Sequence, residues 1–388
     1  MDSTNGFQVF EHGHQDVVQA ADYNFYGNRL VTASSDHRLK VWDLHDGEWE
    51  LTDTWRGHDA EIMDVKWNGP VMGQVLGSVG EDGKFKLWEE DVAEPPNSGR
   101  RFKCIYSHTS PTHVPYSSLD MKNQSLDTFV ALISRDGHLT VYEPSDPDSL
   151  RNWQPLDSLQ VCPNPSRGEE TGFKVRFHKD PLPCFTAVMA GLGERSLSLV
   201  VGAMDTVKVL RTNRYNQFYT AAELKGHRSL VRDVSWARGS VRGSDIIATA
   251  CKDGFVRIFE LTTPSPTGRP LVSTDYVSPP RSASETANTS TPLRGGRNAP
   301  SGIGAGLAGA LRANGGSREN DGDSSQVKHV VREVASLAAH QEGVWRVAFN
   351  MTGDMLATMG DDGRLKTWKR AITGEWVEYA EIGPEEMS

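Results

Sequence analysis

The sequence predicts an all-β fold, a six-bladed β-propeller, and two observations carry this prediction. A short pattern recurs six times along the 388 residues: a turn aspartate, usually followed by glycine, and then an alternating strand that ends on a large apolar residue. A histidine precedes four of the six copies at a similar distance. Repeats of this kind are typical of propellers, in which each copy forms one four-stranded blade.

The six copies are recognised by the turn aspartate and by the apolar residue that ends the strand. The aspartates are Asp36, Asp82, Asp136, Asp205, Asp253 and Asp362. The strand-ending residues are Trp42, Trp88, Tyr142, Leu210, Phe259 and Trp368. This is the sequence form of the WD40 repeat. Because such repeat scaffolds usually bind other proteins, the pattern favours a binding function over catalysis.

Each blade is expected where an alternating, β-branched stretch lies between Gly and Asp turns. In blade one the core strands are expected at 17–24, 29–34 and 39–44. Blade four is the most degenerate copy, because Asp205 lacks the following glycine and its turn is one residue short. The approximate blade ranges are 9–49, 53–91, 102–153, 173–210, 218–261 and 334–382. The predicted organisation is therefore blades one to five within 7–262, an insertion at 263–333 and blade six at 334–382.

The insertion between blades five and six differs from the rest of the chain in composition. It is rich in Ser, Gly, Pro, Thr and Asn and nearly lacks aromatic residues from about 263 to 325. Such a segment cannot bury enough apolar area to offset the entropy of ordering, so a disordered loop is expected. The insertion and its edge also carry four hydroxyl–proline pairs, at Thr263, Ser265, Ser278 and Thr291. These pairs suit proline-directed kinases, and the composition of the segment explains them equally well.

Four copies share a histidine, a hydroxyl residue, the turn aspartate and an aromatic residue. The hydroxyl residue lies four positions before the aspartate each time, and the aromatic residue lies six positions after it. The four sets are His14, Thr32, Asp36 and Trp42; His58, Ser78, Asp82 and Trp88; His227, Thr249, Asp253 and Phe259; and His340, Thr358, Asp362 and Trp368. In the WD40 family these side chains form a buried hydrogen-bond chain between the strands of a blade, and the resemblance implies that role here. A closed polar network satisfies buried groups and fixes one strand register.

Catalytic and cofactor interpretations of these motifs are weaker than structural ones. A Ser/Thr-His-Asp grouping could indicate a hydrolase, but it recurs at equivalent positions and no G-x-S-x-G elbow accompanies it. The Asp-Gly turns lack the further oxygen ligands of a calcium loop. Residues 304–309 spell G-x-G-x-x-G without a preceding strand, which a dinucleotide site needs. The sequence therefore predicts no enzyme, no catalytic residue, no cofactor and no metal site.

Charge and cysteine content restrict the environment and the partners. The net charge of −10 and the pI near 5.7 argue against a general nucleic-acid binder. The four cysteines lie far apart, which favours a reducing compartment. The first eight residues lack the basic start and apolar core of a signal peptide, and no stretch approaches the about 18 apolar residues of a membrane helix. A soluble protein of the cytoplasm or nucleoplasm is expected.

Four blades resemble one family more closely than a general WD40 protein. The segment DYNFYGNRLVTASSDHRLKVWDL at 22–44 and the segment at 57–90 resemble the first two blades of the Sec-thirteen-homologue nucleoporins. The segments DGHLTVYEPSDPDSLRNW at 136–153 and GVWRVAFNMTGDMLATMGDDGRLKTWK at 343–369 resemble the third and the last. The resemblance covers most of the chain outside the insertion. The weak fourth blade and the long insertion depart from it and leave partner contacts on that side open.

The resemblance implies an architectural role. Members of this family form an open six-bladed propeller, which a helical-solenoid nucleoporin completes by donating a blade in trans. They belong, with other outer-ring nucleoporins, to the Y-shaped coat of the nuclear pore at the nuclear envelope. The same propeller serves in the SEA/GATOR complex, which regulates TOR signalling at the vacuole or lysosome. The resemblance therefore implies a scaffold for nucleocytoplasmic transport of protein and mRNA, peripheral to a membrane and without direct nucleic-acid contact.

The two ends of the propeller support an open ring. Residues 374–382 can supply the outer strand of blade six, so Phe7, Val9 and Phe10 are left for a foreign blade or the edge of blade one. Exposed strand edges invite pairing, and a partner strand can satisfy them. Trp345 and Arg346 begin blade six, where either could reach the top face of the channel or Trp345 could pack between blades.

Two other functions remain as alternatives. One is the paralogous six-bladed propeller of the COPII-type vesicle coat. The segment after the aromatic residue of blade three and the sequence of residues 22–42 disfavour this alternative. The other is a WD40 substrate adaptor of a ubiquitin ligase or chromatin enzyme, which needs a closed ring with a basic or aromatic pocket.

Overall fold

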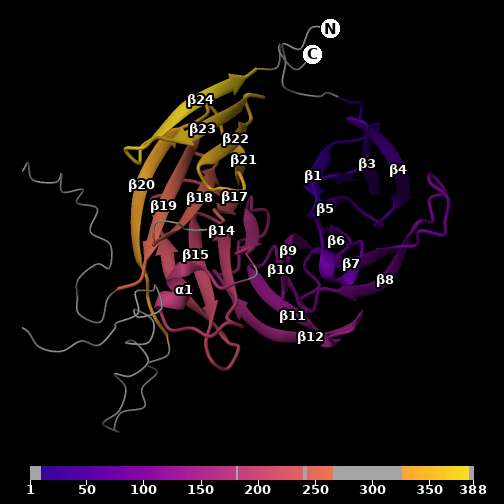
Figure 1. The fold of residues 1–388 in the computed structure, drawn as a ribbon, viewed down its shortest axis with the longest axis horizontal. Helices are drawn as coiled ribbons and strands as arrows, with labels where there is room; N and C mark the ends of the chain where they lie inside the picture. The colour runs from indigo at the N-terminus through magenta and orange to yellow at the C-terminus, as the bar shows by residue number, and fades with distance from the viewer. Residues whose placement is uncertain (1–9, 181, 239–242, 265–325, 384–388) are drawn as a thin grey trace, which may run out of the picture. The chain divides into compact units, whose positions relative to one another are not determined.

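The computed structural model describes residues 10–180, 182–238, 243–264 and 326–383, which form six four-stranded antiparallel sheets. In each sheet the strands follow chain order, from the first near the centre of the ring to the fourth at its outside (Figure 1). The described part is therefore a six-bladed propeller, as the repeat count predicts. It contains one α-helix, α1 (Phe185–Met189), and one 3-10 helix, η1 (Pro70–Met72).

The first three blades occupy the N-terminal half. Blade one contains β1 (Val18–Tyr23), β2 (Arg29–Ser34), β3 (Arg38–His45) and β4 (Glu48–Arg56). Blade two contains β5 (Ile62–Trp67), β6 (Val75–Gly80), β7 (Lys84–Glu90) and β8 (Phe102–Thr109). Blade three contains β9 (Tyr116–Gln124), β10 (Asp127–Ser134), β11 (His138–Asp146) and β12 (Ser149–Gln160).

The last three blades follow in the same order. Blade four contains β13 (Phe173–Phe177), β14 (Ser198–Ala203), β15 (Thr206–Thr212) and β16 (Phe218–Leu224). Blade five contains β17 (Val231–Trp236), β18 (Asp245–Cys251), β19 (Phe255–Thr262) and β20 (Val330–Ala338). Blade six contains β21 (Val344–Phe349), β22 (Met355–Gly360), β23 (Leu365–Arg370) and β24 (Trp376–Ile382).

Three of the expected blade ranges begin one strand earlier than the sheets do. The strands that begin the repeats at 102, 218 and 334 are β8, β16 and β20, and each pairs with the sheet of the preceding blade. The long segment lies between the fifth and sixth repeats, and in the sheets it connects β19 to β20. Thr262 pairs with Val330, so the fifth sheet contains strands from both sides of this segment. The boundary expected at 333/334 falls inside β20.

Blade four is a complete sheet although its turn departs from the repeat. In the other copies a residue with positive φ follows the turn aspartate, for example Gly83 at 71°. In blade four the positive φ falls on Met204, at 59°, directly before Asp205. Because Ala203 pairs with Thr206, the turn is a two-residue hairpin, which needs positive φ at its first central position. The missing glycine therefore reflects a shorter turn rather than a lost strand.

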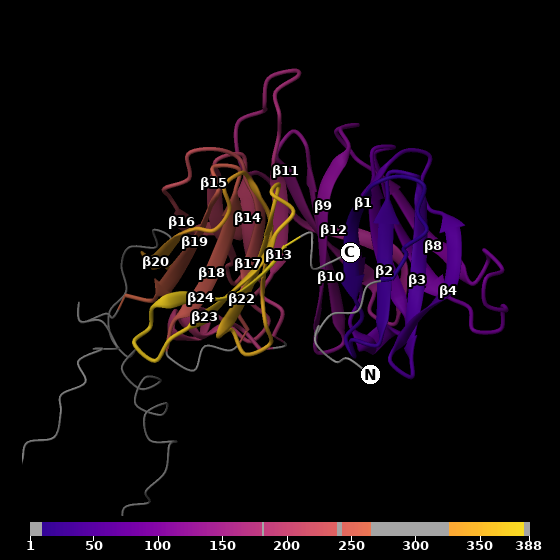
Figure 2. The same ribbon diagram turned by 90° about the horizontal axis from the view of Figure 1, so that it is seen from above.

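The core consists of five separate apolar clusters, one between each pair of consecutive blades from one to six. The first strands of consecutive blades also contact each other, from β1 with β5 to β17 with β21. Among the described residues no cluster joins blade six to blade one. Figure 1 shows β1 and β21 on opposite sides of an opening in the ring, and Figure 2 shows β1 on one side and β22 to β24 of blade six on the other. In the described segments, no helix is both long and apolar enough to cross a membrane.

Candidate partner-binding surface

Three blades contain the complete set of four polar and aromatic side chains. In blade two, His58 Nδ1 lies 2.9 Å from an Asp82 oxygen and Nε2 lies 2.8 Å from the Ser78 hydroxyl, which also accepts from Trp88 Nε1 at 2.9 Å. Hydrogen bonding to His58 and to backbone amides outweighs the effect of burial and lowers the pKa of Asp82 to about 2. The sets in blade one (His14, Thr32, Asp36, Trp42) and blade six (His340, Thr358, Asp362, Trp368) have the same contacts.

Blade five contains an incomplete version of this set. His227 Nε2 lies 2.9 Å from the Thr249 hydroxyl, but the buried Nδ1 of His227 has no partner. Asp253 instead accepts from the Arg257 guanidinium at 2.8 Å. Phe259 has no N–H to donate to the hydroxyl. Because burial and the Arg257 charge disfavour the imidazolium, the pKa of His227 falls to about 4.

Each blade presents to the next blade a surface that we call its forward face, formed by its second and third strands. In blade five this face contains Ala248, Ala250, Val256 and Ile258, all fully buried against blade six. In blade one it contains Val31, Ala33, Leu39 and Val41, all fully buried against blade two. Burying such a face stabilises the ring by about 25 cal/mol for each Å² of apolar area.

The forward face of blade six is the exception. The strand register places Met359 and Leu365 where blade five has Ala250 and Val256. The side chain of Met359 is 42% exposed, whereas Ala250 is 0% exposed. The neighbouring Ala357, Leu365 and Thr367 are half-buried. The forward faces of blades one to five are therefore buried against the next blade, whereas the forward face of blade six is open to solvent.

The opposite, backward face of blade one is also open along its first strand. Tyr23 pairs with Leu30 as Trp67 pairs with Leu76 in blade two. Tyr23 is 56% exposed, whereas Trp67, covered by blade one, is 6% exposed. Phe25 and Tyr26 in the following turn are each 66% exposed. The two sides of the opening are thus both apolar.

Of the three candidate edge residues, Phe10 lies among the described residues and Phe7 and Val9 lie outside them. The ring of Phe10 packs edge-on against Trp42, with centroids 5.1 Å apart, and stacks near Trp49 at 6.4 Å. Phe10 thus covers the outer part of the backward face, and Tyr23, whose ring centroid lies 5.8 Å from that of Trp49, stays more than half exposed.

Of the four candidate phosphorylation sites, Thr263 is described, and Ser265, Ser278 and Thr291 lie outside the described residues. Its hydroxyl donates to the Thr186 carbonyl at 2.8 Å and lies 3.4 Å from His329 Nδ1. A phosphate on Thr263 would remove this donor and break the contact with α1.

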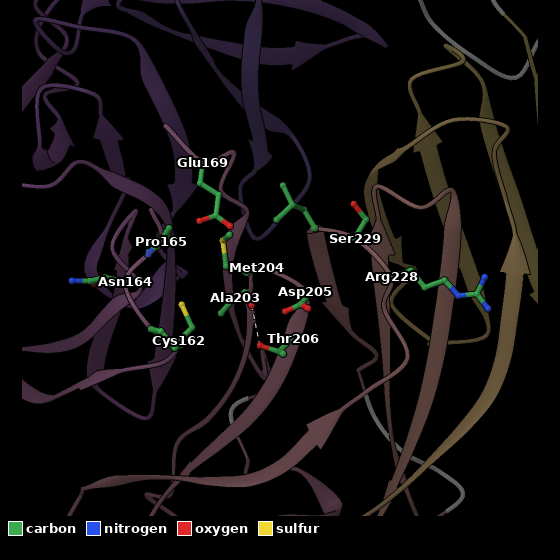
Figure 3. A pocket seen from close by; sticks show the side chains of 12 residues that line it. Cys162, Asn164, Pro165, Glu169, Ala203, Met204, Asp205, Thr206, Arg228 and Ser229 are labelled. Carbon is green, nitrogen blue, oxygen red and sulfur yellow. Dashed lines mark hydrogen bonds between the residues drawn. The ribbon is translucent and has the colours of Figure 1, made fainter. Parts of the chain in front are cut away.

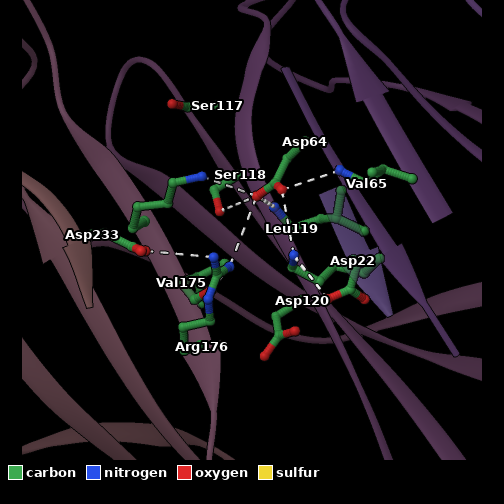
Figure 4. A network of polar contacts seen from close by, with 12 residues as sticks. Asp22, Asp64, Val65, Ser117, Ser118, Leu119, Asp120, Val175, Arg176 and Asp233 are labelled. Carbon is green, nitrogen blue, oxygen red and sulfur yellow. Dashed lines mark hydrogen bonds and ion pairs between the residues drawn. The ribbon is translucent and has the colours of Figure 1, made fainter. Parts of the chain in front are cut away.

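A charged network lines the centre of the ring between the first strands (Figure 4). Asp64 accepts from the Ser118 hydroxyl at 2.8 Å and pairs with Lys174 at 3.2 Å. Although Asp64 is fully buried, the cations Lys174, Lys66 and Arg176 lower its pKa well below the usual range. Burial in turn lowers the pKa of Lys174 to about 8. The network surrounds a cavity of about 550 Å³ that reaches Ala20 on one side of the opening and Arg346 on the other.

Trp345 and Arg346 are adjacent in the chain, but Trp345 lies on the surface of the ring and Arg346 reaches across the opening. Trp345 is 48% exposed, and the Arg232 guanidinium lies 3.7 Å from its ring centroid. Arg346 spans the opening: its guanidinium donates to the Gln19 carbonyl in β1 at 2.7 Å. The sequence showed that these residues begin blade six, but no local signal showed that Arg346 reaches blade one.

A second cavity, of about 490 Å³, lies between loops of blades three, four and five (Figure 3). It is lined by Cys162, Met204, Asp205, Arg228 and the 163–165 turn, among others. Its wall combines apolar residues with the charged residues Glu169, Asp205 and Arg228, and no group of three metal-ligating side chains lies among the described residues.

Comparisons with known proteins agree with the repeat pattern and with the family resemblance. The model of the WD domain, G-beta repeat, matches residues 6–43, 218–260 and 331–369. The protein named nucleoporin SEH1 in Chaetomium thermophilum is 31% identical, with 96% of this chain and 94% of the relative aligned. In Saccharomyces cerevisiae the corresponding figures are 29%, 95% and 97%, and in Homo sapiens they are 28%, 94% and 84%. Family and fold together indicate a structural, non-enzymatic protein. The chain belongs to the SEH1 nucleoporin family.

Proposed function

We propose that this protein is a scaffold subunit of the outer-ring coat of the nuclear pore, located at the nuclear envelope. Membership in a family of nucleoporins supports this role, together with the six-bladed propeller formed by the described residues. As part of the coat, the subunit supports the transport of protein and mRNA between nucleus and cytoplasm. It contacts the membrane only through its partners.

We propose further that a helical-solenoid nucleoporin completes the ring by donating a β-blade in trans. The observation that carries this proposal is the pair of uncovered faces, with Met359 and Leu365 on blade six and Tyr23 on blade one. A seventh blade would bury both faces, as each consecutive pair of blades does inside the chain. Strand or sheet addition by a partner is a recurring way of covering such surfaces.

We propose a second assembly for the same chain, the SEA/GATOR-type complex that regulates TOR signalling at the vacuole or lysosome. The family resemblance supports this proposal. The opening supports it too, because it can accept a blade from any chain with a matching surface. The two assemblies would then compete for one propeller.

Affinity purification of the tagged full-length chain from its own cells, washed at high salt and analysed by mass spectrometry, tests these proposals. Recovery of other outer-ring nucleoporins supports the nuclear pore role, and recovery of TOR-regulating subunits supports the second assembly. Recovery of vesicle-coat subunits or of a ubiquitin ligase, without nucleoporins, would show that the nuclear pore proposal is wrong.

A further inference from the structure

The first strands of consecutive blades are joined by a directional set of polar contacts. A side chain on one blade accepts a hydrogen bond from the backbone N–H of the next. Asp22 Oδ2 accepts from the N–H of Trp67 at 2.8 Å, and Asp120 Oδ2 accepts from that of Phe177 at 2.7 Å. The same relation joins Asp64 to Leu119 at 3.4 Å and Asp233 to Val347 at 3.2 Å. Four of the five junctions in the ring therefore use an aspartate of the preceding blade.

The junction between blades four and five uses a different contact. The first strand of blade four carries Lys174 and Arg176 at its channel-facing positions and no aspartate. Here the cation pairs forward, because the Arg176 guanidinium lies 3.5 Å from Asp233 Oδ1 in β17 of blade five. Figure 4 shows this contact between Arg176 and Asp233. Arg176 also lies 3.8 Å from Asp64 of blade two, so this cation has carboxylates on both sides.

Blade six also carries a cation and no aspartate on its first strand. By register, Arg346 opposite Met359 occupies the position of Lys174 opposite Gly202 in blade four, and the next blade there carries Asp233 at this same position, opposite Ala250. Blade one provides no carboxylate near Arg346. The Arg346 guanidinium instead donates to the Gln19 carbonyl, and no described carboxylate oxygen lies within 4.0 Å of the guanidinium. A cation in a largely enclosed site gains more from a charged partner than from a carbonyl. Arg346 thus contacts a backbone carbonyl, whereas Lys174 at the equivalent position of blade four pairs with the Asp64 carboxylate.

We infer that the opening is occupied by a β-blade of another chain whose inner strand carries an aspartate or glutamate facing Arg346. On binding, Arg346 leaves the Gln19 carbonyl and pairs with this carboxylate, so the residue acts as a latch in the free chain and as a selectivity contact in the complex. The inference rests on the proposed trans-blade function and adds the chemistry that the blade must have.

The described part of a second copy cannot meet this requirement. All its strands already lie in six four-stranded sheets, so a second copy has no described blade to spare. The apolar residues Met359 and Leu365 beside Arg346 match a blade with an apolar face, as Val344 and Val347 of blade six meet blade five. A single helix would cover part of the apolar face but would leave the β1 side exposed.

Zero-length carbodiimide coupling, which joins an amine to a carboxylate in direct contact, tests the inference on the purified complex. The Arg346→Lys variant of the tagged full-length chain provides an amine at the latch. We expect a new cross-link, absent from the unsubstituted chain, to an Asp or Glu in an alternating apolar segment of a partner nucleoporin. Leu126→Lys, in an exposed turn, is the matched control and should not couple to that segment. A cross-link to this chain itself, or to a helix, would overturn the inference, as would no new cross-link.

Charge reversal gives an independent measurement. Arg346→Glu should lower the amount of partner retained through a salt gradient by at least about tenfold, since reversing one member of an enclosed charge pair typically costs more than 1.4 kcal/mol. Changing the cross-linked carboxylate to Lys should restore binding. Arg56→Glu, on the outer strand of blade one, should leave retention unchanged. Circular dichroism should show both variants folded.

The outcomes separate the two proposals. If the unsubstituted chain recovers no nucleoporin, the proposed function fails. If it recovers nucleoporins and Arg346→Glu recovers them equally well, the function stands and the inference about the carboxylate is wrong.

Discussion

At the scale of single residues, the hydroxyl groups at the centre of the polar sets have different numbers of partners. The Thr358 hydroxyl accepts from Trp368 Nε1 at 3.1 Å and contacts His340 Nε2 at 3.0 Å. The Thr249 hydroxyl has only His227 as the corresponding partner, because Phe259 replaces the tryptophan. The two threonines are therefore a natural pair for measuring what the tryptophan contact contributes.

We expect Thr358→Val to destabilise the protein more than Thr249→Val. The substitution preserves the β-branched shape, and at 358 it leaves two buried groups without a partner rather than one. Each such group costs about 1–3 kcal/mol. Thermal and urea unfolding of both variants, followed by tryptophan fluorescence, measures the difference. Equal destabilisation would show that the tryptophan contact contributes nothing.

Buried histidines predict acid sensitivity. Burial, with the nearby cations Lys122, Arg257 and Arg211 respectively, lowers the pKa of His178 to about 4, of His227 to about 4 and of His329 to about 3. Each value lies below the unfolded value of about 6.5, so the unfolded chain binds more protons in acid. Stability is therefore complete above pH 6.5 and is lost as the pH falls toward 4, by about 1.4 kcal/mol per pH unit for each histidine.

Unfolding midpoints at pH 7.5, 6 and 5 test this expectation. His227→Gln, which cannot titrate, should flatten the decline relative to the unsubstituted chain. A midpoint that rises on acidification, or an unchanged slope in the variant, would contradict the assignment.

At the scale of elements, the fifth sheet holds the long segment at both ends. Thr263 contacts α1 and His329, and the buried guanidinium of Arg211 donates to His329 Nε2 at 2.7 Å. Arg211 also pairs with Asp245 at 3.3 Å, so β15, β18 and both ends of the segment meet at one buried cation. Nothing in the local sequence around Leu210 indicated a fully buried arginine, because its partners come from distant strands.

We expect replacement of 265–325 by a short Gly/Ser linker to leave the propeller intact. Thr262 and Val330 already pair, so the linker only closes a hairpin, and shortening a loop changes its closure entropy little. Circular dichroism and the unfolding midpoint should match those of the full chain. A deletion extended through β20 to 338 removes the outer strand of blade five and should lower the midpoint strongly. Equal behaviour of the two deletions would contradict the observed pairing.

At the scale of the whole molecule, blade faces are buried at the five junctions between consecutive blades and exposed at the opening between blades six and one. Leu365 on the forward face of blade six and Val256 on that of blade five are equivalent positions with different environments. Val256 is fully buried, and Leu365 is half-buried. A free chain with such faces exposed is expected to be poorly soluble without its partner.

We expect Leu365→Lys to raise the solubility of the isolated chain and to leave its unfolding midpoint nearly unchanged, because the amine can reach water. Val256→Lys places the same charge between two blades and should prevent folding or lower the midpoint strongly. Static light scattering and thermal unfolding of both variants provide the comparison. Strong destabilisation by Leu365→Lys would show that the face is covered within the chain.

High solubility and cooperative thermal unfolding of the unsubstituted chain alone would contradict the expected dependence on a partner.

The sequence by itself determined the number of blades, the first three strands of blade one to within a residue or two, and the members of the polar sets in blades one, two and six. These features depend on local alternation, tight turns and fixed spacing, which are encoded within each repeat. Only the tertiary structure decided which sheet each outer strand joins, since β20 pairs with β19 across a long segment. It also decided that Arg211 is buried and that Arg346 crosses to Gln19. Such contacts join residues far apart in the chain, and no repeat-sized window contains both partners.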